Sequence, residues 1–201
     1  MKTDFYSTIE KSSVAEFKDR GSKFISYAYP IETVADFKFH LAALKKEHPK
    51  ANHHCFAYRI GLAGIIYRVS DDGEPSGSAG RPILGQIDSK QITNVLIAVV
   101  RYFGGTLLGV PGLINAYKTV AALALQETTI VQKPVLINYR LQFDYTQMND
   151  VMKIVKKLDC VVLKQEIQLF CLLVIAVPKN RMEEVLGKLK ELRGMDVDND
   201  K

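Results

Sequence analysis

NVLIAVVRYF, residues 94–103, is an almost unbroken apolar run rich in β-branched residues. Such a run is typical of a strand that other elements cover on both faces. Gly104 and Gly105 end it, and residues 109–128 then have the alanine and leucine content of a long helix. We therefore predict a central buried strand, a turn at the glycine pair, and a helix that begins near Gly109.

The segments before this strand predict further strands and another helix. Residues 21–31 are rich in aromatic and β-branched side chains and predict a strand. Residues 32–48 repeat apolar side chains at helical spacing, so they predict a helix. Residues 52–60 and 64–70 predict two short strands joined by the turn GLAG.

The segment after the long helix predicts a second domain. Pro134 closes the polar stretch VQKP and marks the boundary. Residues 135–145 alternate apolar and polar side chains, as a half-buried strand does, and residues 146–192 predict helix, strand, strand and helix. This order is one strand short of the ferredoxin-like βαββαβ plan. We predict an α+β protein with domains at 1–134 and 135–201, the second a ferredoxin-like α/β domain.

The composition is that of an ordinary globular protein, with 201 residues, 47% of them hydrophobic and 24% charged. The first residues carry acids and no long apolar core, so they predict no signal peptide, and the apolar runs are too short to span a bilayer. Cys55, Cys160 and Cys171 are odd in number and widely spaced, which argues against a disulfide framework and a thiolate zinc site. We expect a cytoplasmic protein without membrane contact.

The charge favours an anionic partner. The formal net charge is +5. The first 134 residues carry 16 basic and 12 acidic side chains, and the remainder carry 11 and 10. A basic balance is compatible with a polyanion such as RNA, so any such preference is expected mainly in the first domain.

SDDGEPSGSAG, residues 70–80, could hold a metal, cradle a phosphate or build a turn. Asp71, Asp72 and Glu74 match no known metal-binding spacing, whereas Asp-Gly and Glu-Pro dipeptides favour turns. We expect these acids to build the turn and to hold no metal. The small residues of SGSAG precede a predicted helix, so their N–H groups could face an anion, with Arg81 adding charge.

Two further stretches could carry chemistry. Arg101 ends a predicted strand beside Gly104 and Gly105, and in α/β sheets ligands sit beyond the carboxyl ends of strands. The alternative is that the glycines only turn the chain while Arg101 extends to solvent. In HHC, residues 53–55, only His53 and Cys55 share one face of a strand, and two ligands are too few for a closed zinc site. The hypothesis that Cys55 is a nucleophile activated by a histidine stays open.

Three blocks together resemble the signature of the IMPACT family. They are ANHHCFAYRIG, SDDGEPSGSAGRPIL, and RYFGGTLLG followed by GLINAY. The resemblance is strongest from Gly21 to Tyr117, and the domain order is similar to that of the bacterial members. Ser78 stands where the family usually has threonine, Pro111 where it has glycine, and Asn115 where it has arginine. The lost arginine puts in doubt a phosphate contact on the long helix.

The resemblance implies an N-terminal β-α-β domain like domain IV of elongation factor G. It implies a C-terminal domain similar to domain V of that factor. Domains of these two kinds imply RNA or the ribosome as a partner, which is an analogy at the level of the fold. Eukaryotic members of the family are linked to translational control.

From these observations we expect a cytosolic, non-catalytic binding protein that engages RNA or the ribosome in translation regulation. The alternative is a hydrolase, or a site for a small anion or phosphate ligand, that uses the DDGEPSGSAG and RYFGG loops. We expect no cofactor, and a protein partner stays open. The residues predicted to bind an anion or a nucleic acid are Arg59, Arg68, Ser76, Gly77, Ser78, Gly80, Arg81, Arg101, Gly104, Gly105 and Lys118.

Overall fold

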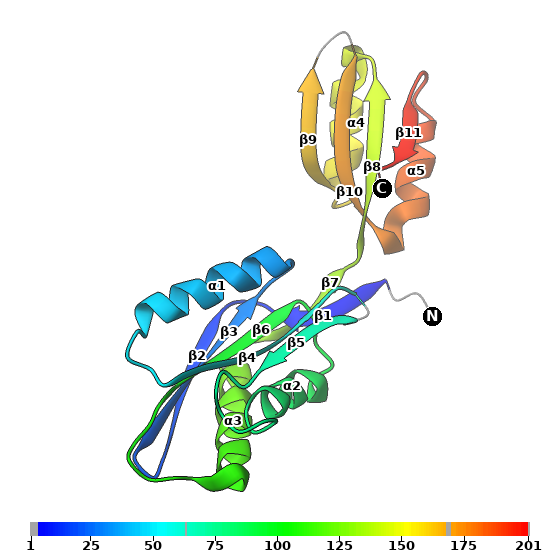
Figure 1. Ribbon diagram of the computed structural model, residues 1–201. Helices are drawn as coiled ribbons and strands as arrows, with labels where there is room; N and C mark the ends of the chain where they lie inside the picture. The colour runs from blue at the N-terminus through cyan, green and yellow to red at the C-terminus, as the bar shows by residue number, and fades with distance from the viewer. Residues whose placement is uncertain (1–3, 63, 168–169, 201) are drawn as a thin grey trace. The chain divides into compact units, whose positions relative to one another are not determined.

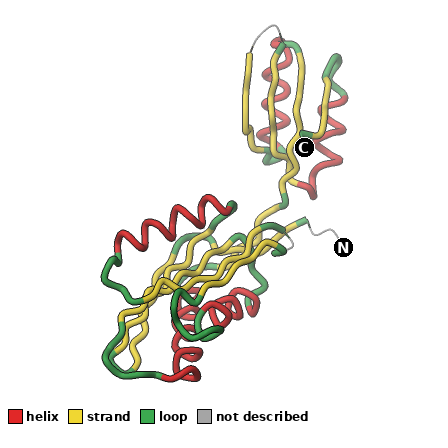
Figure 2. Tube along the Cα trace, viewed as in Figure 1, coloured by secondary structure: helices red, strands yellow, loops and turns green. Residues whose placement is uncertain are grey.

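The computed structural model of the protein describes residues 4–62, 64–167 and 170–200. The chain divides into two compact units, Tyr6–Lys133 and the described remainder, which we call the N-terminal and C-terminal units. Each combines helices with an antiparallel sheet, so the predicted α+β class is confirmed (Figures 1 and 2). Ala63, in the predicted turn GLAG, lies outside the described residues.

The N-terminal unit is built on a five-stranded sheet in which every neighbouring pair of strands is antiparallel. Its central strand is the apolar run, which is buried from Val95 to Arg101. Ile97 and Val99 enter the core on one face, and Leu96 enters the core on the other, as predicted for a strand covered on both sides. In spatial order the strands are Ser13–Asp19 (β2), Ser22–Pro30 (β3), Val95–Tyr102 (β6), His53–Ile60 (β4) and Ile66–Ser70 (β5).

Three helices cover this sheet. Figure 1 shows α1 on one face and α2 and α3 on the other. Phe37 and Leu44 of α1 belong to the same core cluster as Leu96, whereas Tyr117 and Val120 of α3 belong to the cluster on the opposite face. The helices are Val34–Glu47 (α1), Gly80–Ser89 (α2) and Gly109–Gln126 (α3), so α3 begins where the sequence predicts; β1 (Phe5–Ile9) and β7 (Ile130–Pro134) pair separately.

Two expectations need correction in this unit. The strands β1, β2 and β7 are absent from the prediction because polar residues interrupt each of them; β7 falls on the stretch VQKP, where the sequence predicted only a boundary, and β2 is an edge strand that leaves Val14 53% exposed. The second concerns Arg101, for which a ligand site was predicted from the rule that ligands in α/β sheets sit beyond the carboxyl ends of the strands. That rule does not apply to this sheet. Neighbouring strands here run in opposite directions, so their carboxyl ends do not gather at one edge.

The C-terminal unit completes the ferredoxin-like plan. Its elements follow the order β-α-β-β-α-β, and its strands lie in the order β11-β8-β10-β9, all antiparallel. The sixth element, β11, comes from the acidic C-terminal segment, whose polar residues give no strand signal. The likeness to elongation factor G stays a prediction. The elements are Leu136–Phe143 (β8), Met148–Lys157 (α4), Val161–Ile167 (β9), Cys171–Pro178 (β10), Met182–Lys190 (α5) and Asp196–Asn199 (β11), with single 3₁₀ turns before α4 and α5.

Candidate functional site

The glycine-rich loop between β5 and α2 does form an anion cradle, and the chain fills it with its own carboxylate. The Asp71 side chain accepts hydrogen bonds from the backbone N–H groups of Gly77 (2.9 Å), Ala79 (3.0 Å) and Gly80 (2.8 Å). It therefore caps α2, whose own N-cap residue makes no side-chain hydrogen bond. In this structure Asp71 uses the N–H donors of Gly77 and Gly80, which the sequence predicted to face a phosphate.

These hydrogen bonds make the stability of the loop depend on pH. Partial burial raises the pKa of Asp71, but the three N–H donors together with the charge of Arg81 outweigh this effect and hold the pKa below its usual value. A lowered pKa means that the ionised carboxyl stabilises the fold above the unfolded pKa of about 3.9. The stabilisation is lost as the pH falls through the lower pKa of the folded state.

Asp71→Asn is expected to lower the free energy of unfolding of the N-terminal unit by roughly 2 kcal/mol at neutral pH, because a neutral amide replaces a charged acceptor of three hydrogen bonds. The difference from the wild type should shrink below about pH 4. Denaturation from pH 7 to pH 3 measures it, with Asp19→Asn as the matched control. A difference that stays constant with pH contradicts the role of Asp71 as a charged cap.

Glu74 closes the predicted turn, since its backbone N–H donates to the Asp71 carbonyl at 2.9 Å, but its side chain is also a buried acceptor. Its side chain is 3% exposed. Its Oε1 atom accepts from the Arg101 guanidinium at 2.7 Å and from the Tyr117 hydroxyl at 2.7 Å. Burial, together with the neighbouring Cys55 and Glu74, raises the pKa of Tyr117, so its hydroxyl keeps the proton that it donates.

Arg101 is buried as well and joins three separate segments. Besides Glu74, it donates to the Ser22 hydroxyl at 3.3 Å, and its guanidinium lies 5.3 Å from the Phe24 ring and 5.6 Å from the Phe103 ring. Since its side chain is 6% exposed, it does not extend to solvent as the alternative prediction had it. The β2–β3 turn, the glycine-rich loop and the end of β6 therefore meet at one guanidinium.

His53 and Cys55 of the HHC stretch lie next to the Arg101–Glu74–Tyr117 network. The His53 Nδ1 atom donates to the Asp72 carbonyl at 2.8 Å, and its Nε2 atom lies 3.9 Å from Oε1 of Glu74. Cys55 lies within hydrogen-bond distance of the Asp71 carbonyl and the Tyr117 hydroxyl. Burial raises the pKa of its thiol well above the ordinary value, so the thiol stays protonated. This environment argues against Cys55 as a nucleophile.

The glycine pair after β6 lets two backbones approach closely. A Cβ atom at Gly104 would lie 1.9 Å from the Gly21 carbonyl carbon, whereas one at Gly105 would meet nothing within 4 Å. Gly105 instead has a φ of +86°, which favours glycine. Glycine is thus required at the two positions for different reasons. Both agree with the alternative prediction that the glycines of RYFGG only turn the chain.

The other predicted residues do not converge on one point. Arg59 pairs with Asp88 at the end of α2, and Arg68 lies 5.9 Å over Phe56 on the α1 face of the sheet. Arg81 in α2 and Lys118 in α3 are exposed, on helices that pack against each other. Of the remaining predicted positions, Ser76 is exposed, and Ser78 is fully buried with no hydrogen-bond partner for its hydroxyl in the described structure.

Sequence reasoning missed Glu74 and Tyr117 as partners of Arg101. Both lie inside the blocks that carry the family resemblance, so the signal was present, but 43 positions separate them in the chain. Within the described residues no group of three or more His, Cys, Asp or Glu side chains is arranged to hold a metal ion. None of the described helices is long and apolar enough to cross a bilayer.

Comparisons with known proteins cover nearly the whole chain. The family model of the Impact N-terminal domain matches residues 20–125. The IMPACT family member YigZ of Escherichia coli (strain K12) is 34% identical over 85% of this chain and 84% of its own length. An IMPACT family member of Haemophilus influenzae is 35% identical over 91% and 90% of the two chains. A crystal structure of a hypothetical protein superposes with a TM-score of 0.81 at 29% identity, covering 99% of this chain and 98% of its own.

Proposed function

The chain belongs to the IMPACT family, and from this membership and its surface charge we propose that it is a cytosolic binding protein. Its partner is RNA or a ribosomal component, and its role is in translation regulation. The N-terminal unit makes the contact through exposed cations on the side of the sheet that α2 and α3 cover.

The observation that supports this proposal is the excess of basic over acidic side chains in the N-terminal unit. The unit carries 15 Lys and Arg residues against 11 Asp and Glu residues. Glu74 and the buried Arg101 neutralise each other, and the remaining 14 basic and 10 acidic side chains still leave the unit with an excess of positive charge. Arg81 and Lys118 stay exposed, and neither forms an ion pair in the described part of the chain. Such cations attract phosphates at long range.

The contacts of the acids in this unit favour binding over the hydrolase alternative. A hydrolase that works through Asp71, Glu74 or Cys55 would need a carboxylate or thiol there that is free to exchange a proton or to attack. Asp71 and Glu74 accept hydrogen bonds from within the chain, and the Cys55 thiol is held protonated. The buried network therefore supports the loop instead of supplying reactive groups.

Removal of the two exposed cations, Arg81→Gln with Lys118→Gln, is expected to weaken RNA binding and its salt dependence. The slope of log K against log salt should fall by roughly 0.7–0.9 for each lost phosphate contact. Fluorescence anisotropy with single-stranded and hairpin RNA across a salt series measures this slope for the full chain.

The matched control is Lys45→Gln with Lys46→Gln on α1, which removes the same charge from the opposite face of the sheet. It should leave the slope close to that of the wild type. Equal effects of the two double variants contradict a contact on the α2–α3 side. Binding without salt dependence contradicts the proposal as a whole.

A further inference from the structure

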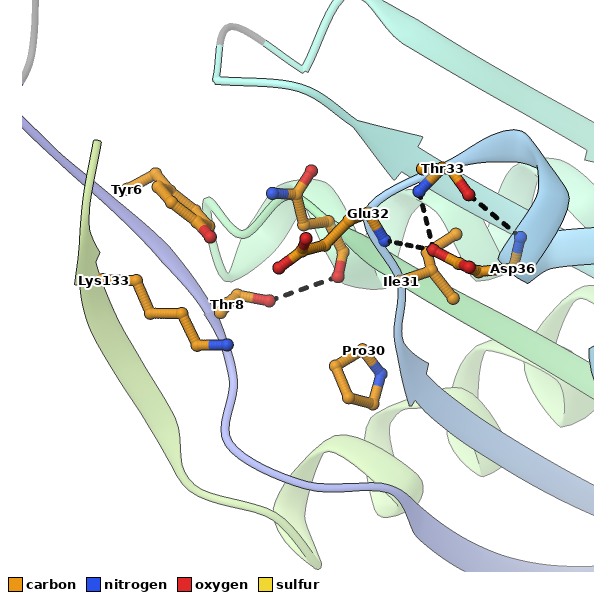
Figure 3. Close-up of a pocket in the computed structure, with 9 residues that line it drawn as sticks. Tyr6, Thr8, Pro30, Ile31, Glu32, Thr33, Asp36 and Lys133 are labelled. Carbon is orange, nitrogen blue, oxygen red and sulfur yellow. Dashed lines mark hydrogen bonds between the residues drawn. The ribbon is translucent and has the colours of Figure 1, made fainter. Parts of the chain in front are cut away.

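A second feature of the N-terminal unit lies apart from the polar network. A pocket of about 430 Å³ opens among β1, β7, the end of β3 and the start of α1 (Figure 3). All its lining residues belong to the segment Tyr6–Lys133. Its volume is at the lower end of the range for small-molecule sites, about 300–1,000 Å³.

The pocket contains charges of both signs. Figure 3 shows the Lys133 side chain entering from β7, while Glu32 and Asp36 enter from the start of α1. Asp36 accepts from the backbone N–H groups of Glu32 (2.9 Å) and Thr33 (2.8 Å). These hydrogen bonds lower the pKa of Asp36, so its carboxyl is ionised at neutral pH.

The charged side chains of the pocket do not form ion pairs with one another. In the described residues, Lys133 forms no ion pair with Glu32 or Asp36, and neither the Lys133 ammonium nor the Tyr6 hydroxyl has a hydrogen-bond partner. Thr8 is 2% exposed, and its hydroxyl donates to the Asn94 carbonyl at 3.3 Å. The hydroxyl oxygen can still accept a hydrogen bond. Half-buried Lys133 thus faces the cavity as a cation without an ion pair in the described structure, and Glu32 and Asp36 form no ion pair there either, although Asp36 accepts the two backbone hydrogen bonds.

A ligand with a single charge matches only half of this lining. A free anion would pair with Lys133 but face the carboxylates of Glu32 and Asp36, and a free cation would meet Lys133. A molecule with both an ammonium and a carboxylate can satisfy the two sides together, because each of its charges meets the opposite sign. Ile31 and Pro30 add an apolar part to the wall, where a short side chain can pack.

We propose that this pocket binds a small zwitterion of the α-amino acid class. The ligand carboxylate pairs with Lys133, its ammonium pairs with Glu32 and Asp36, and the Thr8 and Tyr6 hydroxyls complete the polar contacts. The site is independent of the proposed RNA contact, since it shares no residue with Arg81 and Lys118.

The test uses the full chain labelled with ¹⁵N and titrated with the common α-amino acids. Binding should shift the backbone signals of Tyr6, Thr8 and Asn94. For the best binder, its amide, which lacks the negative charge, and its deaminated acid, which lacks the positive charge, should each bind about tenfold or more weakly. This comparison needs no mutant. If no amino acid shifts these signals, or if either single-charge analogue binds as well, the proposal is wrong.

Two variants test the residues themselves. Lys133→Met and Glu32→Gln should each weaken binding of the same amino acid about tenfold or more, because each leaves one ligand charge unpaired. Lys46→Met removes an exposed cation from the last turn of α1, outside the pocket, and should leave the affinity unchanged. Unchanged affinity in both pocket variants overturns the assignment, and so does an equal loss in the Lys46 control.

Discussion

Arg101→Met is expected to destabilise the N-terminal unit by about 3–5 kcal/mol, since it leaves the buried Glu74 carboxylate without its cationic partner. The two side chains are 6% and 3% exposed and 2.7 Å apart, so water cannot replace the lost interaction. The variant also removes the donor to Ser22 and the guanidinium between two aromatic rings. Native-state hydrogen exchange of the β6 amides measures the change in this unit alone.

The matched control is Lys23→Met in the same sheet. Lys23 pairs with Glu16 at 2.6 Å, but the two side chains are 39% and 40% exposed, so the loss should stay below about 1 kcal/mol. The double variant Arg101→Met with Glu74→Gln should be less destabilised than the sum of its two single variants, because no uncompensated charge remains. Equal small losses for Arg101→Met and Lys23→Met contradict a structural role for the buried pair.

Gly104→Ala is the second change with a large expected effect, roughly 3 kcal/mol of lost stability. The added Cβ would lie 1.9 Å from the Gly21 carbonyl carbon and 2.2 Å from the Ser22 backbone nitrogen. Both are backbone atoms, so no side chain can rotate away, and the β2–β3 turn itself must shift. That turn presents Ser22 to Arg101, so hydrogen exchange should quicken in β3 and β6 together.

Gly85→Ala in α2 is the opposite control. A Cβ there meets nothing within 4 Å, and alanine favours a helix over glycine by about 0.5–1 kcal/mol, so this variant should be more stable than the wild type. Similar losses at positions 104 and 85 contradict the close backbone approach at Gly104.

The elements with a strong local pattern were predictable from the sequence. β6 carries a continuous apolar run because both of its faces are buried, and α3 carries its helical composition along its whole length. β2 and β11 were missed because polar residues interrupt their side-chain pattern, whereas the edge strands β5 and β9 keep β-branched residues that predict a strand. The place of β2 and β11 in a sheet depends on backbone hydrogen bonds to a neighbouring strand, which leave little trace in the side chains.

The candidate site divides in the same way. The sequence by itself predicted a turn in the glycine-rich loop with N–H groups that could face an anion before a helix, and it predicted that Gly104 and Gly105 turn the chain after a buried strand. Only the tertiary structure decided that the anion is Asp71 and that Glu74 is a buried partner of Arg101 and Tyr117. The physical reason is that turn propensity depends on neighbours in the chain, whereas the state of a carboxylate depends on which donors and which solvent surround it in space.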